Sequence, residues 1–221
     1  MSDKPQKLSP QDVEAEDLAD WRILFSTLHA RFRTGDFATG LRLVNRIGEE
    51  AESMNHHPDL DLSYPLLNVR LMSHDAGGVT DRDITLARKI TQFAADLGVT
   101  ADPAAVSVLE LALDTWDHTA IKPFWKAVLA MSDSSAYDEE IVDPGGALPT
   151  LWFQKTDEHD EPRQRFHLDI RVPPEVAEDR IAAALAAGGT LVSEEHAPTF
   201  TVLADAQGNK VCVCTCVGRS G

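Results

Sequence analysis

The spacing of apolar residues changes several times along this chain of 221 residues, and each change limits the structure that a segment can form. Residues 21–33 (WRILFSTLHARFR) and 64–73 (YPLLNVRLMS) alternate apolar with polar side chains, which predicts half-buried strands. Residues 37–54 and 84–97 instead repeat apolar side chains at spacings of three and four, which predicts amphipathic helices. The first half of the chain therefore combines strands with helices that each bury one face.

Both predicted helices carry start and stop signals. Asp36 is placed to cap the first helix, and Pro58 prevents this helix from continuing past two adjacent histidines. Thr80, with Asp83 three residues later, resembles a capping box at the start of the second helix. Gly98 is placed to end that helix.

A change of composition divides the chain near its middle. Residues 98–105 (GVTADPAA) have the composition of a short linker. The first 97 residues carry 11 basic and 16 acidic side chains, and the remainder carries 9 and 20. We therefore predict a domain at residues 1–97, a linker at 98–105 and a second domain at 106–221.

The second half contains a weak internal duplication. Its first part reads as a strand, a helix and a further strand, at residues 106–113, 121–131 and 151–156. A similar order then begins again, with a strand, a helix closed by glycines and a pair of strands, at residues 166–172, 174–189, 199–205 and 210–217. The order of elements repeats without a close repeat of sequence.

Charge, hydropathy and the positions of the cysteines indicate which partners and which cellular compartment to expect. The formal net charge of −16 would repel a phosphate backbone, so we expect no nucleic-acid partner. No apolar run approaches a membrane span, and residues 1–20 lack the pattern of a signal peptide. All three cysteines lie within residues 212–216, where neighbours on one strand cannot form a disulfide scaffold. We therefore expect a cytoplasmic protein with no membrane partner.

Three histidines, His56, His57 and His74, lie where predicted helices or strands meet turns, and functional side chains tend to collect at such positions. Successive helical residues point about 100° apart, so the adjacent His56 and His57 are expected to have different roles. Imidazole has a pKa near 6.5, so three of them can supply both an acid and a base at neutral pH. The residues alone leave two roles open, proton-transfer catalysis and a favourable charge at the negative end of a helix. They lack the i, i+4 spacing of helical metal-binding pairs.

The spacing of five residue types around these histidines resembles the signature of the pterin-4a-carbinolamine dehydratases. The matching positions are Glu52, His56-His57-Pro58, Tyr64, His74 and Asp83, and HDAGGVTDRDITLA extends the match within residues 8–97. The resemblance implies an α+β domain with helices on one face of an antiparallel sheet. It also implies a reaction, the loss of water from a 4a-hydroxytetrahydropterin to give the quinonoid dihydropterin, without a cofactor or metal.

The same resemblance implies roles for individual residues. His56 and His74 correspond to an acid–base pair, Glu52 to an orienting carboxylate and His57 to a substrate contact. Further pterin-contacting positions are occupied by Asn55, Ser73 and Asp75. Asn55 stands where an aspartate can occur, and Leu60 stands where some members carry an aromatic residue. Family members are dimers or tetramers, so a homo-oligomer is expected.

From about Val106 onward the chain resembles the glyoxalase and bleomycin-resistance (vicinal oxygen chelate) superfamily, through FHLDIRV, AAGGTLV and DAQGNKVCVC. This resemblance implies two βαβββ modules, which accounts for the duplication. Glu110 and His167 fall on metal-ligand positions, Cys212 stands where a glutamate usually completes the site, and Gln154 is a fourth candidate. Cys212, Cys214 and Cys216 share one face of a strand, where free cysteines are commonly buried as small apolar residues. We therefore expect a metal-free domain, with a divalent ion as the alternative.

The sequence predicts a dehydratase domain joined to a glyoxalase-like domain of unknown ligand. Two alternatives stay open. The first domain could bind a pterin or stabilise a partner protein without turnover. The second domain could carry a metal-dependent lyase or dioxygenase activity through Glu110 and His167.

Overall fold

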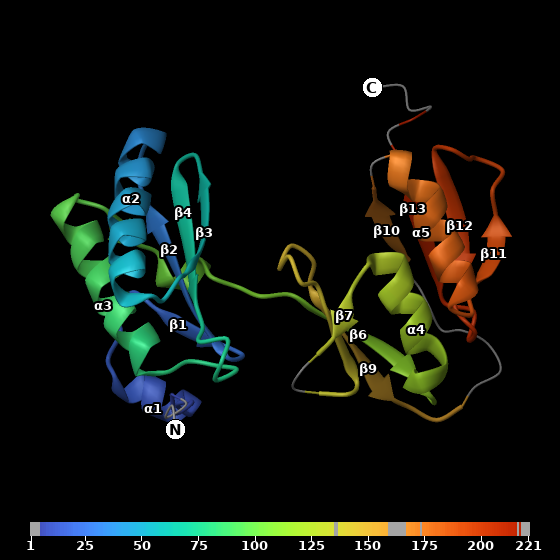
Figure 1. The fold of residues 1–221 in the computed structure, drawn as a ribbon, viewed down its shortest axis with the longest axis horizontal. Coiled ribbons are helices and arrows are strands. Elements are labelled where there is room, and N and C mark those ends of the chain that lie inside the picture. The colour runs from blue at the N-terminus through green and yellow to red at the C-terminus, as the bar shows by residue number, and fades with distance from the viewer. Residues whose placement is uncertain (1–4, 135–136, 159–166, 173, 216, 218–221) are drawn as a thin grey trace. The chain divides into compact units, whose positions relative to one another are not determined.

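The structure is a computed structural model that describes residues 5–134, 137–158, 167–172, 174–215 and 217. Contacts within the chain divide it into two compact units, Met1–Val108 and Leu109–Gly221 (Figure 1). Each unit has its own apolar core, and the two are described separately.

The first unit contains one antiparallel sheet of five strands. Its order is β1-β2-β4-β3, with a short β5 also paired to β2. The strands are β1 (Arg22–Leu24), β2 (Thr27–Arg33), β3 (Asp59–Ser63), β4 (Leu66–Leu71) and β5 (Thr100–Ala101). The long helices α2 (Phe37–Met54) and α3 (Asp81–Asp96) lie together on one face of the sheet, and α1 (Pro10–Ala15) precedes it (Figure 1). This arrangement confirms the expected α+β class.

Two hairpins differ from the strand pattern expected from the sequence. Residues 21–33 form β1 and β2 rather than one strand, because Phe25 adopts a positive φ of 55° and turns the chain. Strand β3, in which Asp59 and Asp61 alternate with Leu60 and Leu62, was not predicted from the sequence. Leu60 and Leu62 nevertheless pack against the core from β3, and β4 pairs with it along its whole length.

Residues 98–105, expected as a linker, lie inside the first unit. Val99 is buried, β5 pairs with the end of β2, and Pro103–Ala105 form a 3-10 turn, η1. Arg33 and Asp102 form an ion pair, and the Asp102 amide donates to the Arg31 carbonyl at 2.7 Å. Glycine, proline and alanine gave this segment the composition of a linker, but its backbone completes the sheet.

The second unit consists of two βαβββ modules. The first contains β6 (Glu110–Thr115), α4 (His118–Leu129), β7 (Ser132–Asp133), β8 (Glu140–Val142) and β9 (Thr150–Lys155). The second contains β10 (Leu168–Arg171), α5 (Pro174–Ala186), β11 (Thr190–Ser193), β12 (Phe200–Ala204) and β13 (Lys210–Cys214). In each module the first and last strands pair in parallel, which gives the orders β6-β9-β8-β7 and β10-β13-β12-β11. The expected pair of βαβββ modules is confirmed.

Both modules contribute to one core. Phe124 and Trp125 of α4 are buried with Leu203 of β12 and Val211 of β13. The Trp125 indole donates a hydrogen bond of 3.0 Å to Asp205, which follows β12, so a buried polar contact also joins the modules. In the described parts of both units, no helix combines the length and apolar character that crossing a bilayer requires.

Candidate functional site

The end of α2 separates the adjacent histidines. Asn55 ends the helix in the left-handed conformation (φ 47°, ψ 44°), and the His56 amide donates back to the Ala51 carbonyl at 3.0 Å. Asparagine tolerates this backbone conformation better than most residues. After this turn the side chain of His56 is buried and that of His57 is exposed. The two imidazoles therefore occupy different environments.

His56 is held by a fully buried carboxylate. Its Nε2 lies 2.7 Å from Oδ1 of Asp83, whose exposed fraction is 0%. The other oxygen, Oδ2, accepts from the Ser73 hydroxyl at 2.8 Å, the Thr80 amide at 2.8 Å and the Thr80 hydroxyl at 3.1 Å. Asp83 is also the third residue of the capping box that starts α3. One carboxylate thus fixes the start of a helix and the orientation of an imidazole.

This contact limits what His56 can do chemically. A carboxylate is an acceptor, so the Nε2–H of a neutral imidazole donates to Asp83 and Nδ1 is left as the acceptor. If Nδ1 takes up a proton, the resulting imidazolium lies directly beside a carboxylate that stabilises it. The geometry suits a general base.

Glu52 contacts a different histidine from the one that Asp83 holds. Its Oε1 lies 3.1 Å from Nε2 of His57, and both side chains are more than half exposed. The carboxylate that orients His56 is therefore Asp83, which the sequence indicated only through the capping box and the dehydratase signature.

The turn between β4 and α3 carries the remaining predicted residues. Ser73 is buried and its hydroxyl belongs to the Asp83 cluster, so it contacts other protein groups. His74 and Asp75 follow it directly and are exposed. Arg82 forms an ion pair with Asp75, and this hydrogen bond is the main reason why the pKa of Asp75 is lowered. The structure brings His56, Ser73 and Asp83 into one cluster, with His74 beside it in sequence.

The metal-ligand candidates of the second unit separate into different groups. The donor atoms of His167, Asp169 and Cys212 all lie within 4.8 Å of one another, and Glu110 is not part of this group. Glu110 lies on β6, where burial, together with the nearby Glu140, raises the pKa of its carboxyl. Gln154 is exposed on β9.

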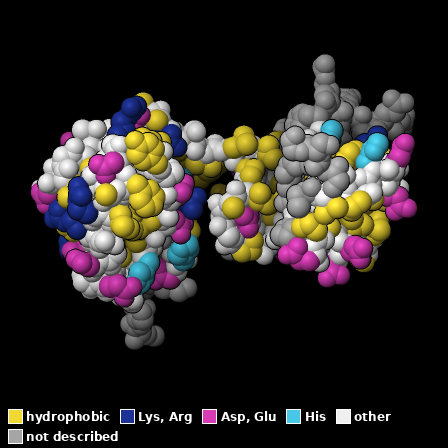
Figure 2. Space-filling model, turned by 90° about the horizontal axis from the view of Figure 1, so that it is seen from above, with side chains coloured by type: hydrophobic (Ala, Val, Ile, Leu, Met, Phe, Trp, Pro, Cys, Tyr) yellow, Lys and Arg dark blue, Asp and Glu magenta, His cyan; other side chains and the backbone are white. Residues whose placement is uncertain are grey.

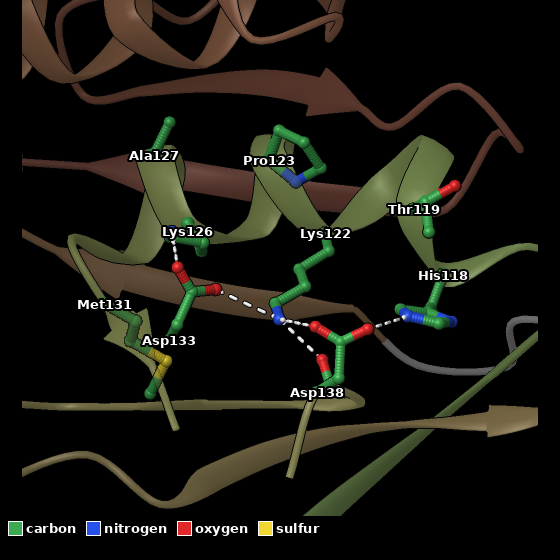
Figure 3. Close-up of a pocket in the computed structure, with 9 residues that line it drawn as sticks. All are labelled: His118, Thr119, Lys122, Pro123, Lys126, Ala127, Met131, Asp133 and Asp138. Carbon is green, nitrogen blue, oxygen red and sulfur yellow. Dashed lines mark hydrogen bonds and ion pairs between the residues drawn. The ribbon is translucent and has the colours of Figure 1, made fainter. Parts of the chain in front are cut away.

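A pocket of ≈ 580 Å³ lies along α4, and Figure 3 shows the side chains that line it. The amine of Lys122 lies 3.0 Å from Asp133 Oδ1 and also bonds to Asp138, whose carboxylate is 3.1 Å from His118 Nε2. Lys126 forms an ion pair with Asp133. The lysines of this pocket are thus paired with carboxylates of the same wall. These pairs tie α4 to β7 and to the residues before β8.

The fold and these contacts define a protein of two units, a small α+β domain with a buried histidine–carboxylate cluster and a paired βαβββ domain. The family model described as pterin 4 alpha carbinolamine dehydratase matches residues 6–93, and that of a glyoxalase-like domain matches residues 110–214. Through its N-terminal unit the chain belongs to the pterin-4a-carbinolamine dehydratase family.

Similar proteins match the first unit over nearly their whole length. Proteins named "Putative pterin-4-alpha-carbinolamine dehydratase" come from Thermosynechococcus vestitus and Aquifex aeolicus. The first is 40% identical over 91 residues, which are 40% of this chain and 96% of that protein. The second is 37% identical over 94 residues, which are 42% of this chain and 95% of that protein.

Solved structures resemble each unit separately. A transcriptional coactivator/pterin dehydratase from Brucella melitensis is 27% identical, with a TM-score of 0.39, and the match covers 40% of this chain and 99% of that one. A glyoxalase/bleomycin resistance protein from Albidiferax ferrireducens is 21% identical, with a TM-score of 0.38, and covers 48% of this chain and 95% of its own.

Proposed function

We propose that the first unit catalyses the dehydration of a 4a-hydroxytetrahydropterin to the quinonoid dihydropterin. Family membership supports the substrate class, since the relatives of this unit are named for the same reaction. The observation that carries the proposal is the buried contact between His56 and Asp83. A histidine held in one orientation by a buried carboxylate is a suitable group for proton transfer.

The reaction needs two proton transfers and no electron transfer. The hydroxyl at C4a accepts a proton and leaves as water, while a ring nitrogen of the pterin loses a proton. We assign the base to His56, because its contact with Asp83 leaves Nδ1 as the acceptor. We assign the acid to His74, which is exposed in the turn that follows Ser73. No cofactor or metal ion takes part in this scheme.

The other residues around the cluster bind or position in this proposal. His57 is exposed beside the helix end and contacts the substrate, with Glu52 as the orienting partner of its imidazole. Asn55 and Asp75 are exposed and contact the pterin in this proposal, with Asp75 held by its ion pair with Arg82. Ser73, expected as a contact, instead positions Asp83, because its hydroxyl is already bonded to that carboxylate.

We also propose that the protein is a homo-oligomer, a dimer or a tetramer. Phe37 and Leu41, one turn apart on α2, are 51% and 45% exposed, and Tyr64 in the β3–β4 turn is 72% exposed. Burying such side chains against a second copy would remove apolar surface from water. Sedimentation equilibrium of the full chain measures the assembly state directly, and a monomer at all concentrations would refute it.

A rate measurement tests the proposed reaction against simple pterin binding. We expect the full chain to accelerate dehydration of a 4a-hydroxytetrahydropterin above its spontaneous rate, and His74→Ala to remove most of the acceleration. A role in pterin binding without catalysis stays open, because Asn55 stands where family members can carry an aspartate. Tight pterin binding measured by calorimetry, with no acceleration of the reaction, would replace the dehydratase proposal with that of a binding module.

A further inference from the structure

Three side chains that can bind a metal ion meet on two neighbouring strands of the second module. Asp169 of β10 is the register partner of Cys212 of β13, and the two strands run in parallel. His167 lies directly before β10, and its Nε2 is 3.3 Å from Oδ1 of Asp169, so the two side chains lie on the same side. The donor atoms of the three residues lie within 4.8 Å of one another. Two adjacent strands and the residue that precedes one of them therefore supply a carboxylate, a thiol and an imidazole at one place.

The spacing of the donor atoms suits a tetrahedral ion. Zinc bonds of about 2.0–2.1 Å to nitrogen and oxygen place two such ligands roughly 3.3 Å apart at the tetrahedral angle. Nε2 of His167 and Oδ1 of Asp169 are already 3.3 Å apart. A longer bond of about 2.3 Å to sulfur extends the separation from a thiolate only slightly. Small side-chain rotations would place all three groups around one ion.

The three side chains differ in their exposure to solvent. Cys212 is 7% exposed, whereas the side chains of His167 and Asp169 are 56% and 49% exposed. The thiol thus lies at the base of the cluster, and the other two groups lie toward solvent. Three protein ligands with an open side leave a fourth position for water or a small ligand, as in catalytic rather than structural zinc sites.

This set differs from the one that the glyoxalase resemblance implies. That set was Glu110, His167 and Cys212, and it draws on strands of both modules. In the structure Glu110 lies outside the cluster, and Asp169 takes the place of its carboxylate. The donor chemistry fits a metal ion, and the ligands come from one module.

We propose that His167, Asp169 and Cys212 form a binding site for a thiophilic divalent ion of the zinc class within the second βαβββ module. A thiolate beside an imidazole and a carboxylate favours Zn²⁺ or Co²⁺ over Mg²⁺ or Ca²⁺, which prefer oxygen ligands alone. The site would give the second unit a ligand-binding or Lewis-acid centre independent of the dehydratase cluster.

Cobalt titration of the full chain tests this proposal without any knowledge of the ligand. Protein stripped with a chelator and kept reduced is titrated with Co²⁺, and the absorption spectrum is recorded. We expect a sulfur-to-cobalt charge-transfer band in the near ultraviolet that saturates at about one ion per chain and is displaced by Zn²⁺. Mg²⁺ in excess should leave the band unchanged.

Four variants identify the ligands. Cys212→Ala should abolish the charge-transfer band, and Asp169→Asn and His167→Gln should weaken Co²⁺ binding by about tenfold or more. Asp169 and His167 are half exposed, so these two variants test the site even if replacement of the buried cysteine impairs folding. Glu110→Gln is the matched control and should bind Co²⁺ like the unchanged protein.

Several outcomes would overturn the proposal. One is the absence of a charge-transfer band in the unchanged protein at millimolar Co²⁺. Another is a band that persists in folded Cys212→Ala. A loss of binding in Glu110→Gln, with Asp169→Asn unaffected, would instead place the ion between the modules.

Discussion

At the scale of single residues, the His56–Asp83 contact connects folding with the proposed chemistry. Asp83 is buried, receives three hydrogen bonds at one oxygen and holds His56 with the other. A carboxylate removed from water needs such partners to remain charged. These hydrogen bonds offset the cost of burying Asp83, and they also fix the orientation of the His56 imidazole.

Replacing this carboxylate should reduce catalysis more than binding. We expect Asp83→Asn to lower kcat at least about tenfold with a small change in KM, because an amide can donate to His56 and favour the wrong tautomer. Asp81→Asn is the matched control, since Asp81 lies in the same first turn of α3 but is exposed. Steady-state kinetics and circular dichroism of both variants measure the effect. An equal loss of kcat in both would show that the helix charge, and not the contact with His56, matters.

Glu110 provides a test of pH-dependent stability. Its pKa is raised above the ordinary value of 4.5, first by burial and then by Glu140, so the ionised form destabilises the folded state. The unchanged protein should therefore become less stable as pH rises from 4.5 through the higher folded-state pKa, because the Glu110 carboxyl ionises over this range. Glu110→Gln should raise the melting temperature at pH near 7 and lose this advantage below the unfolded-state pKa. If Glu110→Gln has a lower melting temperature than the unchanged protein at neutral pH, a destabilising ionised carboxyl at this position is contradicted.

At the scale of elements, the sequence predicted helices better than strand ends. The spacing of apolar residues and the caps Asp36 and Thr80 located α2 and α3 correctly, because caps and periodicity are local properties. Strand β3 pairs with β4 across a tight turn, and the short β5 pairs with the distant β2. Both strands depend on these partners, and neither was predicted from its own composition. The same limit applied to the site, where Asp83 was recognised as a cap but its contact with His56 joins residues 27 positions apart.

The packing of α5 against α4 gives a prediction at this scale. A Cβ on Gly189 would overlap the ring of Phe124, which is fully buried, and would approach the Ala184 carbonyl at 2.9 Å. We expect Gly189→Ala to destabilise the second unit by about 1–3 kcal/mol. Gly48→Ala, in the interior of α2 with nothing within 4 Å of its Cβ, is the control and should stabilise by about 0.5–1 kcal/mol. Calorimetry of both variants measures the two changes in stability. If both variants were stabilised, the packing of Gly189 against Phe124 would be contradicted.

At the scale of the whole molecule, the protein combines two units with separate cores and separate candidate chemistry. Figure 2 shows carboxylates on the surfaces of both units, in keeping with the net charge of −16. The buried histidine cluster belongs to the first unit, and the proposed metal ligands belong to the second. The boundary after Val108 lies beyond the expected linker because β5 and η1 complete the first unit.

This division predicts that the first unit works alone. Residues 1–108 should fold cooperatively and retain the kcat/KM of the full chain, because every contact of the His56 cluster lies within them. A fragment ending at residue 97 should be less stable, since it lacks buried Val99 and the β2–β5 pairing. Thermal unfolding and activity of both fragments check this. Equal stability of the two fragments would show that β5 is dispensable.

The most direct test of the account is the dehydration rate of the full chain with a single change at His56. We predict that His56→Gln lowers the protein-catalysed rate, measured after subtraction of the spontaneous rate, by about 100-fold or more. Such a loss is expected when a general base is removed. His29→Gln, which changes a half-buried histidine on β2 of the same unit, should leave the rate unchanged. A folded His56→Gln protein that dehydrates 4a-hydroxytetrahydropterin as fast as the unchanged chain would contradict the proposed role of the His56–Asp83 contact.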